Sequence, residues 1–280
     1  MNVELSYEKH PYTITPKTTR EVFKASNCSP ERLNSLAAFD FAEECGGTFW
    51  NLKRALLTRL AFHQHVQRNP ETYNTAEKKD EGLQNTHRYT KTGTVRIALM
   101  RKGLYVCAFA DLDNKEQARQ LIEAGYTAHS KGDKLILSEK DARICDLIEQ
   151  AEQTKRIASA LKKNPTLISV KEEGKQSKYK KNQYAVAAFG PDAAEWNAKY
   201  LLESGFEAGR FWDYTDKEFA TFLTKGQAEV CSVGLGGVVC GNFIVDAVDG
   251  FYYSGWARSV VHVGGAQNSP SEKKVRKVRA

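Results

Sequence analysis

The chain has 280 residues, of which 41% are hydrophobic and 27% are charged, and this composition excludes collagen-like, wholly disordered and disulfide-scaffold proteins. A chain of this length is expected to form one large domain or two small ones. Lys and Arg together number 41 against 34 Asp and Glu, which gives a formal net charge of +7 and favours polyanionic partners.

The sequence predicts neither a membrane span nor an export signal. Its apolar runs stay short of the roughly 18 residues that cross a bilayer, and residues 1–13 lack a basic stretch followed by an apolar one. We therefore expect a cytoplasmic protein without membrane contact. The six cysteines form no C-x-x-C pair and are expected to be reduced thiols, so we predict no metal site and no cofactor.

Residues 1–93 are predicted to form an N-terminal region of an extended arm, two helices and a polar linker. Three prolines within residues 1–30 favour an arm with little regular structure. Helical spacing of apolar residues predicts helices over residues 31–45 and 48–66. Residues 67–93 are poor in apolar side chains, which predicts an exposed linker.

An internal repeat follows this region. Residues 105–128 align with residues 185–208 without a gap, and eight of the 24 positions are identical. A second block repeats further on, where residues 150–152 and 227–229 both read Gln-Ala-Glu. Self-similarity of this kind predicts two copies of one structural unit.

Each copy is predicted to fold as a ferredoxin-like βαββαβ unit, and the first strand of copy two should start near Tyr184. A further strand at 95–100 should turn at Arg101-Lys102-Gly103. The fold class is then α+β, with an N-terminal helical region and tandem ferredoxin-like units. The first unit covers residues 94–170, and residues 184–264 hold the second unit together with a β-rich C-terminal segment. A doubly wound parallel sheet is the rival topology. The expected elements of copy one are strands at 104–110, 126–129, 134–137 and 166–170 and helices at 114–124 and 139–160.

Copy one also resembles the SPOR domain pattern. An aromatic and apolar strand at 104–110 precedes the helix end Ala118-x-x-Leu121-x-x-x-Gly125-Tyr126, and a second strand and helix follow. The resemblance covers about 50 residues and implies the same order of strands and helices. SPOR domains bind cell-wall glycan outside the membrane, and we take from the resemblance the topology and not the activity.

The excess positive charge lies in two segments that we predict to be flexible. Residues 171–183 form a Lys-rich linker with a net charge of +3, and residues 265–280 form a basic tail expected to be disordered. We therefore predict a non-enzymatic, cytoplasmic protein that binds DNA or RNA through phosphate contacts. The predicted contact residues are Lys53, Arg54, Arg59, Arg101, Lys102, Lys175, Lys178, Lys180, Lys181, Lys273, Lys274, Arg276 and Lys277.

Exposed aromatic side chains on strands could add base stacking, and the candidates are Tyr105, Tyr184 and Trp212. The sequence does not contain the aromatic motif of an RNA-recognition motif at the matching strands. His63 and His65 have the spacing of a metal-binding pair on a strand, but they fall in a helical pattern, where their rings diverge.

Two other functions remain open. The chain could be an interaction or assembly subunit of a virus or mobile element, and would then associate with a protein partner or itself through an exposed β-edge in residues 230–264. It could also be a nuclease whose site lies between the two repeats.

Overall fold

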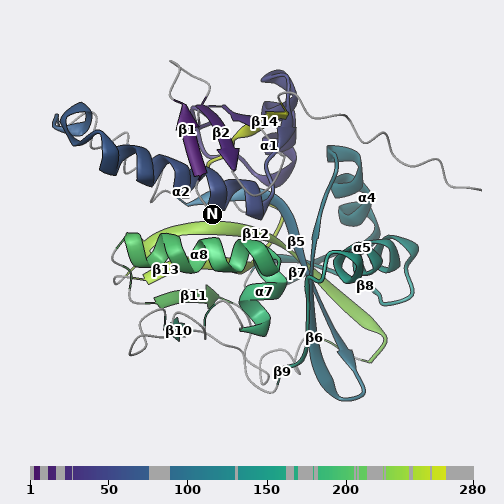
Figure 1. Cartoon of the computed structure of the whole chain (residues 1–280). Coiled ribbons are helices and arrows are strands. Elements are labelled where there is room, and N and C mark those ends of the chain that lie inside the picture. The colour runs from purple at the N-terminus through teal and green to yellow at the C-terminus, as the bar shows by residue number, and fades with distance from the viewer. Residues whose placement is uncertain are drawn as a thin grey trace, which may run out of the picture.

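The computed structural model describes residues 3–6, 12–16, 23–26, 28–75, 89–129, 132–161, 167–169, 179, 182–204, 206, 208–212, 223, 225–239, 242–252 and 254–262. Within these residues the chain is a mixed α+β protein with six α-helices and two sheets whose neighbouring strands are mostly antiparallel (Figure 1).

The larger sheet is built around β5 and β12. Its strands follow the order β10-β11-β13-β12-β5-β6-β9, and β8 pairs with both β12 and β7. The pair β11–β13 is parallel, and the other pairs are antiparallel. The strands are β5 (Thr90–Arg101), β6 (Leu104–Asp111), β7 (Tyr126–His129), β8 (Gly132–Ser138), β9 (Ile157–Leu161), β10 (Leu167–Ser169), β11 (Ala208–Trp212), β12 (Gln227–Val239) and β13 (Asn242–Asp249).

The smaller sheet joins segments from both ends of the chain, in the order β1-β2-β3-β14-β4. The segment expected to be an arm with little regular structure therefore contributes three strands. Pro16 is compatible with a strand because it is the last residue of β2. Its missing N–H therefore removes no hydrogen bond from the middle of the strand. The strands are β1 (Val3–Ser6), β2 (Tyr12–Pro16), β3 (Phe23–Ala25), β4 (Thr48–Phe49) and β14 (Ser259–His262).

The six helices of the described residues pack around the sheets, and a 3₁₀ turn, η1 (Pro70–Tyr73), follows the second of them. Helix α5 packs on β6, helix α7 packs on β6 and β9, and helix α8 packs on α2 and α7 (Figure 1). Asparagine or aspartate side chains cap four helices, at Asn34, Asn51, Asp141 and Asn182. The helices are α1 (Ser35–Glu44), α2 (Leu52–Arg68), α4 (Lys115–Gly125), α5 (Ala142–Gln153), α7 (Gln183–Phe189) and α8 (Pro191–Glu203).

Helix α2 begins four residues later than the sequence predicts. Thr48 and Phe49 form β4 and pair with β14, so they are extended. The side chain of Asn51 then accepts a hydrogen bond from the backbone N–H of Arg54 at 2.9 Å, which satisfies a donor of the first helical turn. This cap places Lys53 and Arg54 in the first turn of α2.

The core contains several buried charged side chains beside its apolar ones. Lys91, Arg96 and Glu229 are fully buried, and Arg59 is 1% exposed. Arg96 Nη2 lies 2.7 Å from Glu229 Oε1, which makes an ion pair inside the sheet. Burial of a charge is tolerated when such pairing and hydrogen bonds replace water.

Copy one of the repeat begins in the predicted order, since β6, α4, β7, β8 and α5 follow one another along the chain, but residues 157–161 form β9 where the second helix was expected to continue. Copy two begins differently, because its expected first strand near Tyr184 is helix α7. The repeated Gln-Ala-Glu triplets also differ, since the first lies in α5 and the second opens β12. A tandem ferredoxin-like duplication is therefore not confirmed, and the supported description is a mixed α+β fold.

The helix at the start of copy two has a physical explanation. Its sequence, QYAVAAF, contains three alanines and a single β-branched residue, which favours a helix over a strand. The side chain of Asn182 accepts hydrogen bonds from the N–H groups of Tyr184 and Ala185, and Gly190 ends the helix at a φ of 83°. Most of its side chains are buried, as expected of a helix that is apolar all round.

The C-terminal strands do not offer the exposed edge that was expected in residues 230–264. Strand β12 pairs with β5 on one side, and with β8 and β13 one after the other along its opposite side. Strand β13 lies between β11 and β12, and β14 lies between β3 and β4. These described strands already have neighbouring strands, so the fold gives no support to the predicted association through residues 230–264.

Candidate functional site

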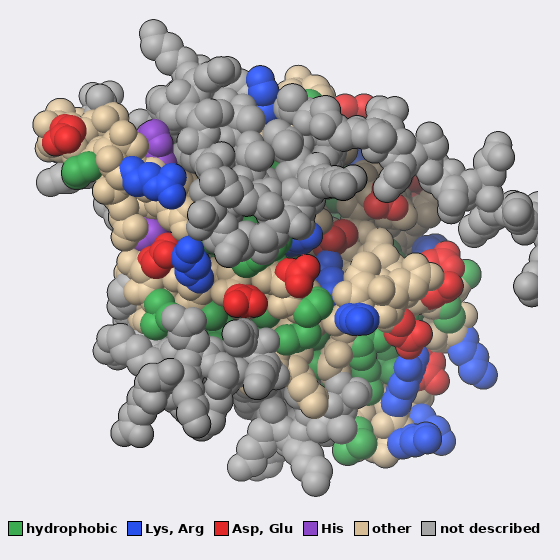
Figure 2. Space-filling model, in the orientation of Figure 1, with side chains coloured by type: hydrophobic (Ala, Val, Ile, Leu, Met, Phe, Trp, Pro, Cys, Tyr) green, Lys and Arg blue, Asp and Glu red, His purple; other side chains and the backbone are tan. Residues whose placement is uncertain are grey.

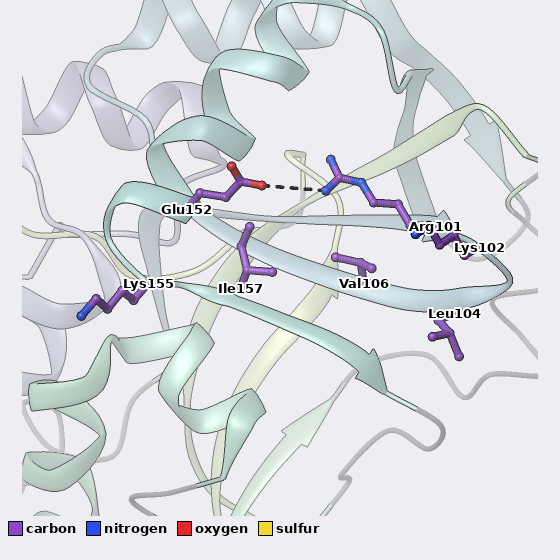
Figure 3. Close-up of a pocket in the computed structure, with 7 residues that line it drawn as sticks. All are labelled: Arg101, Lys102, Leu104, Val106, Glu152, Lys155 and Ile157. Carbon is purple, nitrogen blue, oxygen red and sulfur yellow. Dashed lines mark ion pairs between the residues drawn. The ribbon is translucent and has the colours of Figure 1, made fainter.

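The β5–β6 hairpin and the C-terminal end of α5 enclose an open groove of about 610 Å³, which we call the hairpin groove (Figure 3). Side chains from β5, β6, α5 and β9 line it, so it depends on the packing of α5 on β6. Lys and Arg side chains gather with hydrophobic ones in the part of the molecule where the hairpin projects (lower right in Figure 2). The lining residues are Arg101, Lys102, Leu104, Val106, Glu152, Lys155 and Ile157.

A two-residue turn forms the tip of the hairpin. Its central residues are Lys102, with a φ of 53°, and Gly103, with a φ of 73°. Positive φ at both positions is the requirement of a type I′ turn, whose twist matches that of the flanking strands. Asparagine or aspartate is favoured at the first of these positions, but this chain has a lysine there.

A second lysine occupies the left-handed position at the end of α5. Lys155 has a φ of 57°, and the neighbouring N–H groups close the helix. The N–H of Arg156 donates to the carbonyl oxygen of Ala151 at 2.7 Å, and the N–H of Lys155 donates to that of Glu152 at 3.1 Å. This pair of bonds is a Schellman motif, in which glycine is the usual residue at the position of Lys155.

The floor of the groove is apolar. Leu104 and Val106 point to the same face of β6 because side chains alternate along a strand, and Ile157 of β9 pairs with Ala108 next to them. Leu104 is 38% exposed, since α5 ends before it covers this part of the sheet. Lys102 and Lys155 lie at opposite ends of the groove, with Val106 and Ile157 between them (Figure 3).

The charges of the groove do not cancel. Arg101 Nη1 lies 3.8 Å from Glu152 Oε1, and both side chains are more than half exposed, so this ion pair contributes little to stability. Lys102 and Lys155 are both exposed and add two further positive charges. The groove therefore combines an apolar floor with a net positive rim.

A second basic cavity of about 400 Å³, which we call the α2 pocket, lies on the other side of the turn that joins α5 to β9. Lys53 and Arg54 enter it from the first turn of α2, and the first turn of α8 forms another wall. Lys53 Nζ lies 5.5 Å from the centre of the Trp196 ring. The lining residues are Asn51, Lys53, Arg54, Asp111, Thr154, Arg156, Phe189, Gly190, Pro191, Asp192 and Ala193.

A hydrogen-bond network around Asp111 forms the floor of the α2 pocket. Arg156 Nη1 lies 2.9 Å from Asp111 Oδ1, and the same oxygen accepts a hydrogen bond from Thr94 Oγ1 at 2.6 Å. Asn51 Nδ2 donates to Asp111 Oδ2 at 2.9 Å. Burial by itself would raise the pKa of the Asp111 carboxyl, but the charge of Arg156 and hydrogen bonds from these three side chains outweigh it and lower the pKa.

Arg156 connects this network to α7. Its Nη2 donates to the carbonyl oxygen of Ala188 at 2.9 Å and its Nε to that of Ala187 at 3.4 Å. These carbonyls lie at the C-terminal end of α7, where a positive charge is stabilising. The Arg156 side chain is 7% exposed, and its bonds connect the end of α7 to Asp111 in the wall of the pocket.

Substitution of Asp111 by Asn is expected to lower the free energy of unfolding at pH 7 by about 2–3 kcal/mol, because Arg156 loses its anionic partner. The folded-state pKa of Asp111 lies below its ordinary value of 3.8, so its contribution is complete above that pH and is lost as the pH falls through the lower, folded value. Denaturant unfolding of both proteins between pH 7 and pH 3 measures this. A constant difference between them down to pH 3 would contradict the assignment.

The sequence-predicted contact residues divide into four groups. Arg101 and Lys102 lie in the hairpin groove, and Lys53 and Arg54 lie in the α2 pocket. Arg59 is buried instead. The remaining eight lie outside the described residues, namely Lys175, Lys178, Lys180, Lys181, Lys273, Lys274, Arg276 and Lys277.

Arg59 binds the protein itself, which corrects its assignment as a phosphate contact. Its guanidinium donates to the carbonyl oxygens of Leu235 and Gly236 at 3.0 Å and to Thr90 Oγ1 at 2.9 Å. Burial lowers the pKa of Arg59 to about 10, so it still carries its charge at pH 7. Leu235 and Gly236 belong to β12, so the guanidinium of Arg59 faces the sheet and not solvent.

The stacking candidates are also corrected. Tyr105 is 3% exposed and Tyr184 is fully buried, so neither presents a ring to a base. Tyr184 instead packs edge-to-face on Phe109, with ring centres 5.5 Å apart. The side chain of Trp212, in β11, lies outside the part of the chain that the structure describes.

Lys155 and Arg156 are functional candidates that the sequence did not reveal. Both fell inside the helix expected over residues 139–160, and α5 ends earlier, at Gln153. The signal that could have found them is the turn itself, but without a glycine the end of the helix is not marked.

The two histidines of α2 contact different partners, as their helical spacing predicts. His63 packs edge-to-face on Tyr200, with ring centres 5.8 Å apart, and His65 lies next to Phe62. Burial lowers the pKa of both imidazoles. Among the described residues, no three His, Cys, Asp or Glu side chains are grouped closely enough to bind a metal ion.

None of the helices in the described ranges has the length and apolar character needed to cross a bilayer. Comparison with known proteins finds no matching family model, no matching curated protein and no matching solved structure.

Proposed function

We propose that the protein binds nucleic acid through phosphate contacts in the hairpin groove, with Arg101, Lys102 and Lys155 as the contact residues. The observation that carries this proposal is the position of the two lysines. Among the described residues, Lys102 and Lys155 are the two non-glycine residues with positive φ, and both line this groove.

These positions are unfavourable for lysine. A side chain in the left-handed conformation costs roughly 1–2 kcal/mol, and glycine avoids most of this cost. Strained residues of this kind cluster at functional sites, where the strain is retained because the side chain is needed. Both lysines are exposed, so the packing of the core does not explain their presence.

The shape of the groove suits an extended polyanion. Positive charges stand at its two ends, and an apolar floor between them offers contact area for sugars and bases (Figure 3). Phosphates along a strand release bound counterions when lysine and arginine neutralise them, which drives association without a sequence-specific contact. The groove therefore supports binding of DNA or RNA without distinguishing between them.

Binding is a better proposal than catalysis for these cavities. Neither the hairpin groove nor the α2 pocket is lined by a histidine, and their described carboxylates are Glu152, Asp111 and Asp192. Glu152 faces Arg101, and Asp111 is held by Arg156. A cleft that combined a histidine and carboxylates from both repeats would have favoured the nuclease alternative.

Fluorescence anisotropy with a labelled, unphosphorylated 20-nucleotide RNA and its DNA equivalent tests the proposal. We expect saturable binding at 50 mM salt that weakens steeply by 200 mM, because each phosphate contact adds to the salt dependence. An uncharged polymer of similar size should not compete. Absence of binding at 50 mM salt would contradict the proposal, and so would an affinity that does not change with salt.

A further inference from the structure

The α2 pocket concentrates positive charge where helix electrostatics disfavours it. The N-terminus of a helix carries a partial positive charge, so acidic residues are stabilising in the first turn and basic ones are not. Helix α2 has no acidic residue in its first turn, but has Lys53 and Arg54 there, and both side chains line the pocket.

The first turn of α8 faces the same cavity. Its N-cap is Gly190, with a φ of 83°, which has no side chain to cap the helix. Asp192 contributes a negative charge in this turn, and Asp111 on the floor is paired with Arg156. Lys53 and Arg54 therefore leave the pocket with a net positive charge.

The dimensions of the pocket limit what it can hold. Its volume of about 400 Å³ is in the range of small-ligand sites, which run from about 300 to 1,000 Å³. Asn51 and Asp111, which are hydrogen-bonded to each other, form part of its lining. A chain end or a small molecule can enter, and Phe189 and Pro191 offer it apolar contacts.

We propose that the α2 pocket binds a phosphate monoester, which is either the terminal phosphate of a nucleic-acid strand or the phosphate of a free nucleotide. A monoester carries about −1.5 to −2 charges at pH 7, more than an internal phosphodiester, and its oxygens accept bidentate hydrogen bonds from an arginine. Lys53 and Arg54 bind these oxygens in this assignment. A pocket of this kind is independent of strand binding in the hairpin groove.

Isothermal titration calorimetry with adenosine 5′-monophosphate and with adenosine tests this assignment. We expect the monophosphate to bind at least about tenfold more tightly than the nucleoside, the scale of one charge-assisted hydrogen bond. The double variant Lys53→Gln/Arg54→Gln should lower the affinity for the monophosphate by a similar factor. Arg68→Gln, at the other end of α2, removes an exposed arginine from the same helix and should leave it unchanged.

Oligonucleotides that carry a phosphate at the 5′ end, at the 3′ end or at neither end distinguish the two sources. A preference for a phosphorylated end that the double variant loses assigns the pocket to strand ends, and monophosphate binding without such a preference assigns it to free nucleotides. Displacement of the monophosphate by inorganic phosphate in the unaltered protein supports either assignment without any substitution.

Three results would overturn the inference. They are equal affinity for the monophosphate and adenosine, binding of neither the monophosphate nor a phosphorylated end, and unchanged affinity in a folded double variant. Because unphosphorylated strands report on the hairpin groove alone, failure of the proposed function is distinguishable from failure of this pocket.

Discussion

Substitution of Glu229 by Gln is expected to lower the free energy of unfolding by about 3–5 kcal/mol, because it leaves the buried guanidinium of Arg96 without its anionic partner. The two side chains are fully buried, and Nη2 of Arg96 lies 2.7 Å from Oε1 of Glu229. Arg96 also donates to the hydroxyl oxygen of Tyr105 at 3.3 Å, and Cys231 Sγ donates to Glu229 Oε1 at 3.2 Å. Denaturant unfolding followed by circular dichroism measures the loss.

The matched control removes both charges. The double variant Arg96→Met/Glu229→Leu should recover most of the lost stability, because apolar side chains of similar size often replace a buried ion pair without loss. Recovery distinguishes an unpaired buried charge from a general defect of packing at this place. A loss below about 1 kcal/mol for Glu229→Gln would show that water reaches the pair.

Replacement of both Lys102 and Lys155 by Gly is expected to weaken nucleic-acid binding while it stabilises the fold. Each substitution removes a cation, which lowers affinity roughly tenfold per lysine at low salt. Each also relieves a left-handed residue, which raises the free energy of unfolding by about 1 kcal/mol. Anisotropy at 50 mM salt and denaturant unfolding measure the two effects on the same preparation.

The charge-conserving variant Lys102→Arg/Lys155→Arg is the control. It keeps both cations and the strained backbone, so neither affinity nor stability should change by much. Loss of stability in the glycine variant would mean that the lysines contribute structural contacts. Unchanged affinity in the glycine variant would remove the hairpin groove from the interface.

Local patterns in the sequence were sufficient to predict three features of copy one of the repeat. Alternating apolar residues predicted β6, helical spacing predicted α4, and Arg101-Lys102-Gly103 predicted the hairpin turn that the structure contains. These elements depend on contacts between residues near one another in the chain, and such contacts leave a periodic signal.

Copy two could not be predicted from its similarity to copy one. The identity of Val106 with Val186 and of Phe109 with Phe189 places like residues in unlike elements, β6 and α7. An apolar segment of seven residues is compatible with a buried strand or a buried helix, and packing decides between them. The polar cap at Asn182 and the alanine content were the signals that favoured the helix.

The candidate sites were only partly predictable for a similar reason. Arg101 and Lys102 were identified because charge in a hairpin turn is visible in the sequence. The burial of Arg59 depends on carbonyl oxygens of Leu235 and Gly236, which are more than 170 positions away in the chain. Lys155 joins the groove because α5 ends where no glycine marks its end.

The salt dependence of nucleic-acid affinity, compared between the unaltered protein and the Lys102→Gly/Lys155→Gly variant, tests the central claim most directly. If both lysines contact phosphates of a single strand, the slope of log affinity against log salt concentration should decrease in magnitude by about 1.5 in the variant. Equal slopes for the two proteins would contradict the assignment of the hairpin groove as the nucleic-acid interface.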